Sequence, residues 1–207
     1  MILMLGSVAM TLTSCGKVEV DPINDNYRTF YEIFVYSFCD SNGDGYGDIP
    51  GIISKLDKLE SLGIDAIWLS PVYKSPQVDN GYDVADYYDI DPAYGTLEDF
   101  KKLLDMAHGM GIRVIMDQVL NHSSDKCKWF QEAKKSRDNP YRNYYIWHDG
   151  KPDGSEPNNW ANYFYEGKGS AWEWYEATQQ YYLHLYSKHM PDLNRDYQPL
   201  REEVYAM

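Results

Sequence analysis

The stretch IRVIMDQVLNH, from Ile112 to His122, decides the fold. It opens with branched apolar residues, which are typical of a strand buried on both faces. It closes with Asp117, Asn121 and His122, whose side chains offer oxygen and nitrogen atoms to a ligand. A buried strand that ends in such residues predicts a parallel sheet with a binding site at the carboxyl ends of its strands.

Strands and helices alternate before this stretch. TFYEIFVYSF, residues 29–38, and IDAIWLSPV, residues 64–72, are aromatic or branched and predict two further strands. GIISKLDKLESLG, residues 51–63, places its apolar residues on one helical face and ends in glycine. Residues 97–111 repeat that pattern behind Thr96, a helix-capping residue type. This order predicts an α/β barrel or an open parallel sheet.

The alternation of strands and helices is interrupted in two places. Residues 73–95 are rich in turn-forming residues and predict a long loop. From residue 123 to about 188, Asn, Gly, Tyr and Trp dominate, and KWFQEAKKS is the last helix-length periodic run. We interpret this second region as an inserted subdomain, within which QQYYLHLYSKH, residues 179–189, forms a strand.

Charge and composition limit the class of ligand. The chain has 32 acidic and 19 basic residues and a net charge of -13, which argues against nucleic acid as a partner. It also has 20 Tyr and 6 Trp among its 207 residues. Aromatic and acidic side chains together suit a neutral polar ligand that is both stacked and hydrogen-bonded, such as a sugar.

The first residues, 1–15, predict an export signal. MILMLGSVAMTLTSC is apolar, too short to span a bilayer, and ends in small residues before Cys15. Its last four residues resemble the lipobox of bacterial lipoproteins, which implies lipidation at Cys15 and a membrane-anchored protein facing the periplasm or the cell exterior. No Lys or Arg precedes the apolar run, so a plain secretory signal or a disordered end stays open. Residues 16–28 are a spacer in this interpretation.

An acidic, glycine-rich stretch follows the first predicted strand. DSNGDGYGD places oxygen-bearing side chains at Asp40, Asn42, Asp44 and Asp48, with glycines between them. Hard oxygen ligands on a tight loop suit Ca²⁺. The helix-loop-helix calcium motif does not apply, because Gly51 stands where that motif needs Glu. The alternative is a hydrated turn without a metal.

Three polar clusters follow the three predicted strands. They are DSNGDGYGD, then NGYDVADYY from residue 80, then DQVLNH. In α/β barrels, ligands bind at the carboxyl ends of the strands. Because parallel strands end at the same edge, the sequence predicts that these clusters contribute to one site.

MDQVLNH resembles the strand-three signature of the α-amylase family of glycoside hydrolases. NGYDVADYYDIDPAYGTLEDF resembles the loop after strand two of that family, and MPDLN, residues 190–194, resembles the motif that closes its inserted B domain. The resemblance implies the N-terminal portion of a (β/α)8 barrel, with strands one to three and two helices in residues 29–122. The B subdomain would then span residues 123–189, and residues 190–207 would return to the barrel before strand four, so that the barrel is incomplete.

The resemblance also implies roles for individual residues. Tyr82 would stack on the sugar beside the scissile bond, Asp83 would accept hydrogen bonds from its hydroxyls, and His122 would donate to them. The residues implied to support the site are Asp117, Asn121 and Asp192. Relatives with this acidic loop bind Ca²⁺ through Asp40, Asn42, Asp44, the carbonyl of Tyr46, and Asp48, so the ion would stabilise the loop. The alternative is that these side chains have structural roles only.

The family reaction is retaining hydrolysis of α-glucosidic bonds, for which two carboxyl groups are needed. The family takes them from strands four and five, so we expect no catalytic residue within this chain, and the nucleophilic Asp and the acid Glu beyond Met207. We predict that residues 1–207 alone neither hydrolyse starch nor fold stably, because three strand-helix units cannot close such a barrel.

Met190 stands where α-glucosidases and oligo-1,6-glucosidases usually carry Gln. With Met, residues 190–194 resemble the group intermediate between oligo-1,6-glucosidases and neopullulanases, several of which are lipoprotein α-amylases. This resemblance favours hydrolysis of α-1,4 bonds in starch or maltooligosaccharides. The alternatives are an exo-acting α-glucosidase or oligo-1,6-glucosidase, a transglucosidase similar to trehalose synthase, and a lipoprotein that binds maltooligosaccharide without cleaving it. Cys39 and Cys127 could form a disulfide in an exported protein, or they could remain two free thiols.

Overall fold

The computed structural model describes residues 28–164 and 169–207. The predicted signal peptide with Cys15, and the predicted spacer as far as residue 27, lie outside the described residues. Within the described ranges, no helix is both long and apolar enough to cross a membrane.

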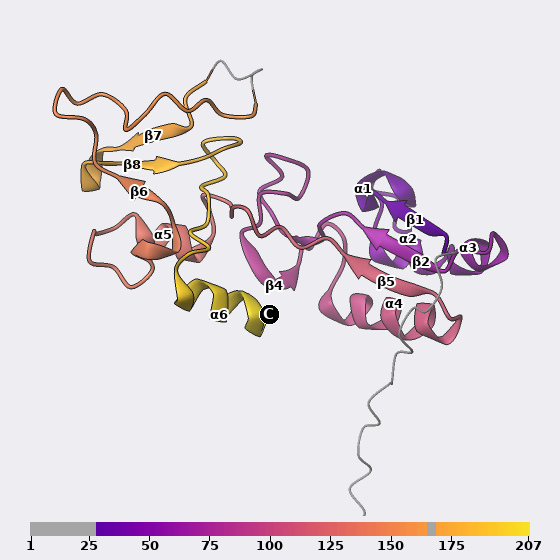
Figure 1. Cartoon of the computed structure of the whole chain (residues 1–207). Coiled ribbons are helices and arrows are strands. Elements are labelled where there is room, and N and C mark those ends of the chain that lie inside the picture. Colours follow the sequence, from indigo (N-terminus) through magenta and orange to yellow (C-terminus); the bar gives the residue numbers. More distant parts are fainter. Residues whose placement is uncertain (1–27, 165–168) are drawn as a thin grey trace, which may run out of the picture.

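A parallel sheet forms the centre of the first lobe. Its strands are β1 (Phe30–Ile33), β2 (Ala66–Leu69) and β5 (Arg113–Met116), in the order β1-β2-β5 (Figure 1). Ile33 pairs with Leu69, and Leu69 pairs with Met116, so the three strands end at one level. The predicted parallel sheet is therefore confirmed, and the polar stretches after the strands begin at the same edge.

The first predicted strand was too long. After Ile33 the chain turns into α1 (Val35–Phe38), although these residues are mostly aromatic or branched. The backbone N–H of Gly47 donates to the Tyr36 carbonyl at 2.7 Å, and a Cβ on Gly47 would lie 2.0 Å from the Val35 carbonyl oxygen. The acidic loop therefore folds back tightly onto residues 35–36, and this contact favours the helical turn over local strand propensity.

Three helices cover one face of the sheet. The predicted helix at 51–63 is divided into α2 (Ile49–Ile53) and α3 (Leu56–Ser61), and α4 spans Leu97–Gly109. Thr96 and Asp99 form a complete capping box at the start of α4, as its sequence indicates. Buried apolar side chains from these helices and from β1 and β2 form one core, including Ile52, Leu56, Ile67, Leu69 and Leu103.

The opposite face of the sheet is open. Glu32, Trp68 and Ile115 are paired side by side across the three strands. Trp68 is 39% exposed and Ile115 is 41% exposed. The expectation that these strands are buried on both faces is thus met on the helix side only.

The predicted loop between residues 73 and 95 contains an antiparallel pair that the sequence did not indicate. It consists of β3 (Tyr73–Lys74) and β4 (Asp86–Ile90), with an irregular register between Tyr73 and Lys74. The pair extends from the sheet toward the second lobe (Figure 1).

The insertion forms the second lobe. It contains α5 (Lys128–Ala133) and a sheet of β6 (Trp147–His148), β8 (Gln180–Leu183) and β7 (Trp172–Tyr175), in that order and all antiparallel. The strand predicted at residues 179–189 is confirmed over Gln180–Leu183, and residues 184–189 are not part of a strand. Two 3-10 turns, Arg142–Tyr144 and Glu176–Thr178, connect these elements. The Phe130 ring packs against Tyr145, Trp147 and Tyr182 in an aromatic core.

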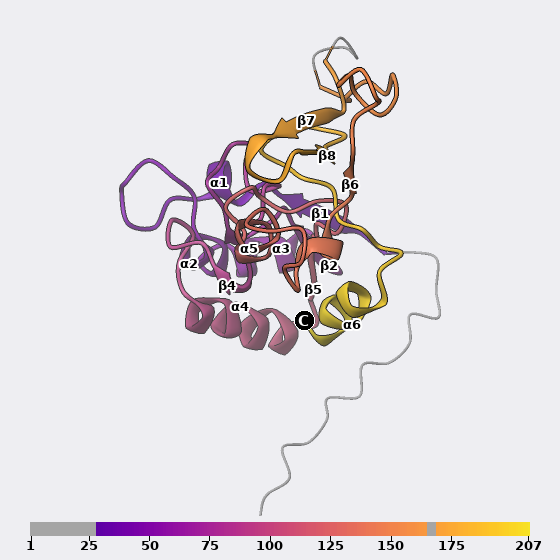
Figure 2. The ribbon, with the colours of Figure 1, turned by 90° about the vertical axis from the view of Figure 1, so that its left-hand side faces the viewer.

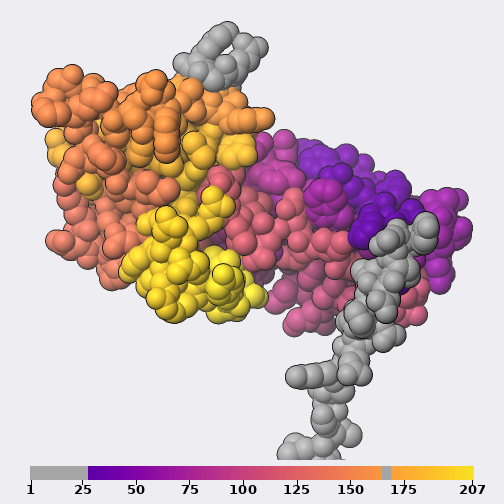
Figure 3. Space-filling model, in the orientation of Figure 1, coloured from indigo at the N-terminus to yellow at the C-terminus, as the bar shows by residue number. Residues whose placement is uncertain are grey.

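The two ends of the insertion meet at a narrow neck, in which residues 121–123 pair with residues 191–193. His122 and Asp192 form an antiparallel bridge, and the Leu193 N–H donates to the Asn121 carbonyl at 2.9 Å. Figure 3 shows the lobes as two masses joined at this region. After the neck, α6 (Gln198–Ala206) packs its buried Leu200 against the second lobe. Both views place α4 and α6 on one side of the molecule and β6–β8 on the other (Figure 1, Figure 2).

The two cysteines that the structure describes are free thiols. Cys39 follows α1 in the first lobe, and Cys127 precedes α5 in the second. Of the two alternatives that the sequence leaves open, the structure has the unpaired thiols.

Candidate active site

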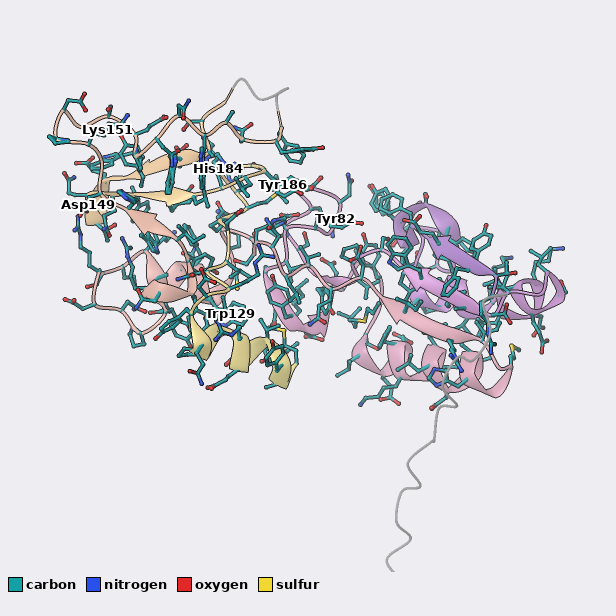
Figure 4. The ribbon with its side chains drawn as sticks, in the orientation of Figure 1. Tyr82, Trp129, Asp149, Lys151, His184 and Tyr186 are labelled. Carbon is teal, nitrogen blue, oxygen red and sulfur yellow. The ribbon has the colours of Figure 1, made fainter. Side chains whose placement is uncertain are left out.

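A cavity of about 450 Å³ lies where the two lobes meet. Tyr82 enters it from the loop before β4, the segment after β5 forms its floor, and Tyr186 from the insertion forms its opposite wall. Figure 4 shows Tyr82 and Tyr186 close together at the junction of the lobes. The remaining residues that line the cavity are Asp79, Asp117, Gln118, Val119, Leu120, Asn121 and His122.

Tyr82 and Asp117 are joined directly. The Tyr82 hydroxyl donates to the Asp117 carboxylate at 3.0 Å. Burial, followed by the hydrogen bond to Asp117 and then by the negative charge of that residue, raises the pKa of Tyr82 to about 12. Tyr82 is therefore a neutral donor whose ring orientation is fixed by the carboxylate at the end of β5.

His122 lines the cavity but is 4% exposed. Its Nε2 lies 3.2 Å from the Tyr82 carbonyl, and its Nδ1 lies 3.2 Å from the Asn121 amide nitrogen. Because a carbonyl only accepts, Nε2 carries the proton and Nδ1 accepts from Asn121. Burial lowers the pKa of His122 to about 4, so the ring is neutral near pH 7. The Tyr186 ring lies over it, with 5.2 Å between ring centroids.

Asp83 is fully buried and does not line the cavity. Its carboxylate accepts from the Ser75 hydroxyl at 2.8 Å and from the N–H groups of Val78 and Asp79 at 3.1 and 3.0 Å. These bonds close the loop that carries Tyr82. Asp83 therefore orders the wall of the cavity through the backbone.

Asp192 occupies the neck below the cavity. Its carboxylate accepts from the Leu185 N–H at 3.1 Å and from the Asn121 side chain at 3.4 Å. Burial raises the pKa of Asp192 to about 6. Asn121 thus connects His122 to Asp192, and the predicted supporting residues form one hydrogen-bonded group behind Tyr82.

The sequence did not indicate two of the residues in the cavity. Asp79 is brought there by the hydrogen bonds that its loop makes with Asp83, and Tyr186 is brought there by the fold of the insertion. The position of Tyr186, four residues before Met190 in the motif that closes the insertion, is the one signal that could have placed it near the neck.

In the acidic loop, side-chain oxygens accept hydrogen bonds from backbone N–H groups of the same loop. Asp40 accepts from the N–H groups of Asn42, Gly43 and Gly45, which lower the pKa of its carboxyl. The Asn42 side chain accepts from the Asp44 N–H, and Asp44 accepts from Tyr46 N–H.

Asp48 is buried at the other end of that loop. Its carboxylate accepts from Gly51 N–H at 2.6 Å, which caps α2, and from the Ser41 hydroxyl at 2.8 Å. In the ranges that the structure describes, no three His, Cys, Asp or Glu side chains gather as a metal cluster. Asp40, Asn42 and Asp44 are exposed on this loop, and the Asn42 side-chain amide donates to the Asp44 carboxylate at 3.1 Å.

Comparisons with known proteins agree on one family. The family model described as alpha amylase, catalytic domain, matches residues 32–207. The chain is 57% identical to the oligo-1,6-glucosidase of Heyndrickxia coagulans over 86% of its own length and 31% of that protein. It is 51% identical to the trehalose-6-phosphate hydrolase of Bacillus subtilis, with the same coverage. The chain thus spans about a third of the length of the curated relatives it matches.

Solved structures show the same fold. The crystal structure of Bacillus licheniformis trehalose-6-phosphate hydrolase is 51% identical and superposes with a TM-score of 0.84. A variant of trehalulose synthase MutB in complex with glucose is 52% identical and superposes with a TM-score of 0.83. Each match covers 86% of this chain and 32% of the other. Together with the parallel sheet and the inserted lobe, these matches show that the chain belongs to the alpha-amylase family of glycoside hydrolases and forms the N-terminal portion of its catalytic barrel.

Proposed function

We propose that the complete enzyme hydrolyses α-glucosidic bonds of short α-glucosides with retention of configuration, and that it prefers the α-1,6 bond. The observation that carries this proposal is the cavity of Tyr82, Asp117 and Tyr186, in a chain 57% identical to an oligo-1,6-glucosidase. The sequence motifs favoured α-1,4 hydrolysis of the α-amylase type, whereas the similarity to oligo-1,6-glucosidases supports the α-1,6 alternative.

Met190, which favoured the α-1,4 interpretation, lies away from the cavity. Its side chain is fully buried and is not among the residues that line the wall. Met190 therefore has no direct contact with a sugar in the cavity, and its identity gives little information about the bond that is cleaved.

Tyr82 and Asp117 are the residues that we propose to contact the sugar in the cavity. The face of an aromatic ring packs against the C–H groups of a sugar, and a carboxylate is a strong acceptor for hydroxyl groups. His122 and Asp83 contribute mainly by positioning Tyr82, because both ring nitrogens of His122 and both carboxylate oxygens of Asp83 already have protein partners. A sugar hydroxyl would reach the His122 N–H only by replacing the Tyr82 carbonyl.

The reacting carboxyl groups are proposed to come from the part of the barrel that follows Met207. A retaining glycosidase needs a nucleophile and an acid about 5–5.5 Å apart on either side of the bond. Asp117 already accepts the Tyr82 hydroxyl, which suits a binding role more than either of those two.

The test is the activity of the complete enzyme on isomaltose, maltose and soluble starch, with the product anomer followed by NMR. We expect isomaltose to be cleaved fastest and α-glucose to appear first. Faster cleavage of starch into oligosaccharides would support the α-amylase type, and transfer products would support a transglucosidase. Binding without turnover would instead indicate a maltooligosaccharide-binding protein.

We also propose that the loop at residues 40–48 binds Ca²⁺. Support comes from the spacing of its ligands and from the exposed oxygens of Asp40, Asn42 and Asp44. The predicted ligands Tyr46, through its carbonyl, and Asp48 would complete the set. The ion would stabilise the end of β1 and would take no part in the chemistry.

Export and lipid anchoring at Cys15 remain proposals. They rest on the apolar run of residues 1–15 and its lipobox-like end. Labelling cells with a radioactive or clickable fatty acid would test them, since only a lipidated protein incorporates the label. A Cys15→Ser variant is the matched control, and equal label in both proteins would contradict the proposal.

A further inference from the structure

Tyr87, in β4, is bonded to the floor of the active-site cavity. The floor consists of residues 117–122, which directly follow β5 and all line the cavity. The Tyr87 hydroxyl lies 2.8 Å from the carbonyl oxygen of His122 and 3.0 Å from that of Val119. Tyr87 is buried and does not line the cavity itself. It therefore contacts the floor without contacting a ligand in the cavity.

The two carbonyls depend on this one hydroxyl. A phenol has a single proton, so Tyr87 donates to one of the carbonyls or shares its proton between both. Within the described ranges, no backbone N–H donates to the carbonyl of Val119 or His122. A buried carbonyl without a donor is costly. Because the two carbonyls are three residues apart, the hydroxyl fixes the turn between them, which contains Leu120 and Asn121.

The insertion fixes the ring of Tyr87. Trp129 of α5, in the second lobe (Figure 4), stacks on this ring with 5.3 Å between the centroids and 18° between the planes. Close by, the Ser124 N–H donates to the Val84 carbonyl at 2.7 Å. Burial raises the pKa of Tyr87 well above its usual value, so the hydroxyl keeps its proton near pH 7. One side chain thus connects the insertion to the floor of the cavity.

The two ends of the floor hold Tyr82. At one end, the Asp117 carboxylate accepts from the Tyr82 hydroxyl at 3.0 Å. At the other end, His122 Nε2 donates to the Tyr82 carbonyl at 3.2 Å. A shift of the floor would therefore change both contacts of Tyr82, although neither Asp117 nor His122 had been altered.

We propose that Tyr87 is a positioning residue for sugar binding. Its hydroxyl holds the backbone of the floor, so that Asp117 and His122 keep Tyr82 in place, and its stacking on Trp129 makes this arrangement depend on the insertion. The sugar ligand rests on the proposed function, whereas the hold of Tyr87 on the floor does not.

The experiment compares Tyr87→Phe with Tyr182→Phe in the complete enzyme. Tyr182 is the matched control, because it is also buried and donates to a backbone carbonyl, that of Lys188, at 2.8 Å within the insertion. Tyr87→Phe should raise KM for isomaltose about tenfold with little change in kcat, as expected when binding to substrate and transition state is weakened equally. Tyr182→Phe should leave KM unchanged. Loss of folded enzyme alone would lower the apparent kcat and leave KM as it was.

Hydrogen exchange measured by mass spectrometry gives a readout that does not depend on activity. Peptides that contain residues 117–124 should exchange about tenfold faster in Tyr87→Phe than in the wild type, and should be unchanged in Tyr182→Phe. If the wild type cleaves no glucoside, the proposed function fails, and hydrogen exchange alone decides the role of Tyr87. Unchanged exchange in these peptides would overturn the proposal, and so would an unchanged KM in an active enzyme.

A second variant serves if Tyr87→Phe does not fold. Trp129→Phe keeps the Tyr87 hydroxyl but removes part of the ring on which Tyr87 stacks. It should change KM and hydrogen exchange in the same direction and to a smaller extent. Exchange in the floor peptides equal to that of the wild type would then overturn the proposal.

Discussion

The hydroxyl of Tyr82 is the polar contact that connects the loop before β4 to the end of β5. We expect Tyr82→Phe to lower kcat/KM of the complete enzyme about tenfold, or about 1.4 kcal/mol, because the ring remains but its hydrogen bond to Asp117 is lost. Tyr88→Phe is the matched control, since Tyr88 donates to Glu203 at 3.0 Å outside the cavity. Steady-state kinetics with isomaltose measure both variants. Equal losses would mean that the Tyr82 hydroxyl has no special role.

His122 and Asp192 should act on stability in opposite directions as pH changes. The pKa of His122 is lowered from 6.5 to about 4, so the unfolded chain binds the proton first and stability falls as pH drops from about 6.5 to about 4. The pKa of Asp192 is raised from 3.8 to about 6, so the folded chain binds more protons and stability falls as pH rises from about 3.8 to about 6. Between about pH 4 and 6 the two contributions oppose each other.

This opposition gives a prediction for single variants. Compared with the wild type, Asp192→Asn should show a steeper fall in melting temperature as pH decreases from 6 to 4, because the His122 contribution is no longer offset. His122→Asn should show the reverse slope difference. Melting curves of the complete enzyme at several pH values measure both. Identical pH slopes in all three proteins would contradict the assigned shifts.

At the scale of elements, the loop at residues 40–48 should affect stability in two ways, through the proposed bound metal and through the cap of α2. Asp44 lies exposed on the loop, whereas Asp48 is buried and caps α2. We expect a chelator to lower the melting temperature of the wild type by a few degrees, and to change Asp44→Asn little. Asp48→Ala should lose about 1 kcal/mol of stability even in the presence of chelator, because the cap is lost. A wild type that melts equally with and without chelator would exclude the metal.

The elements that could be predicted from the sequence are those whose conformation depends on residues close together in the chain. The start of α4 was predicted because Thr96 and Asp99 carry the whole signal within four residues. The Val35–Phe38 segment was predicted wrongly as strand, because the close approach of Gly47, a contact that is distant in sequence, decides its conformation. In the candidate active site, Asp117, Asn121 and His122 were predicted from the single motif DQVLNH that follows β5. Tyr186 was missed because only the folded insertion brings it to the cavity.

At the scale of the whole molecule, the open face of the parallel sheet limits what this chain does alone. Trp68 and Ile115 are substantially exposed on the face that a closed barrel would bury. We expect residues 1–207, expressed alone, to associate or to unfold without a sharp transition, and to show no hydrolysis of starch. Size-exclusion chromatography, thermal melting and dye binding measure this, with the complete enzyme as control. A monomer with a cooperative transition would contradict the prediction.

The neck has a consequence for how such a protein changes over generations. Because residues 121–123 and 191–193 pair with each other, the whole insertion leaves and rejoins the barrel through one seam. Recombination at that seam would exchange one insertion for another while the register of the parallel strands stays the same. Tyr186, which lines the candidate site, is therefore carried on an insertion that such an exchange would replace, whereas Tyr82 and Asp117 would stay in place.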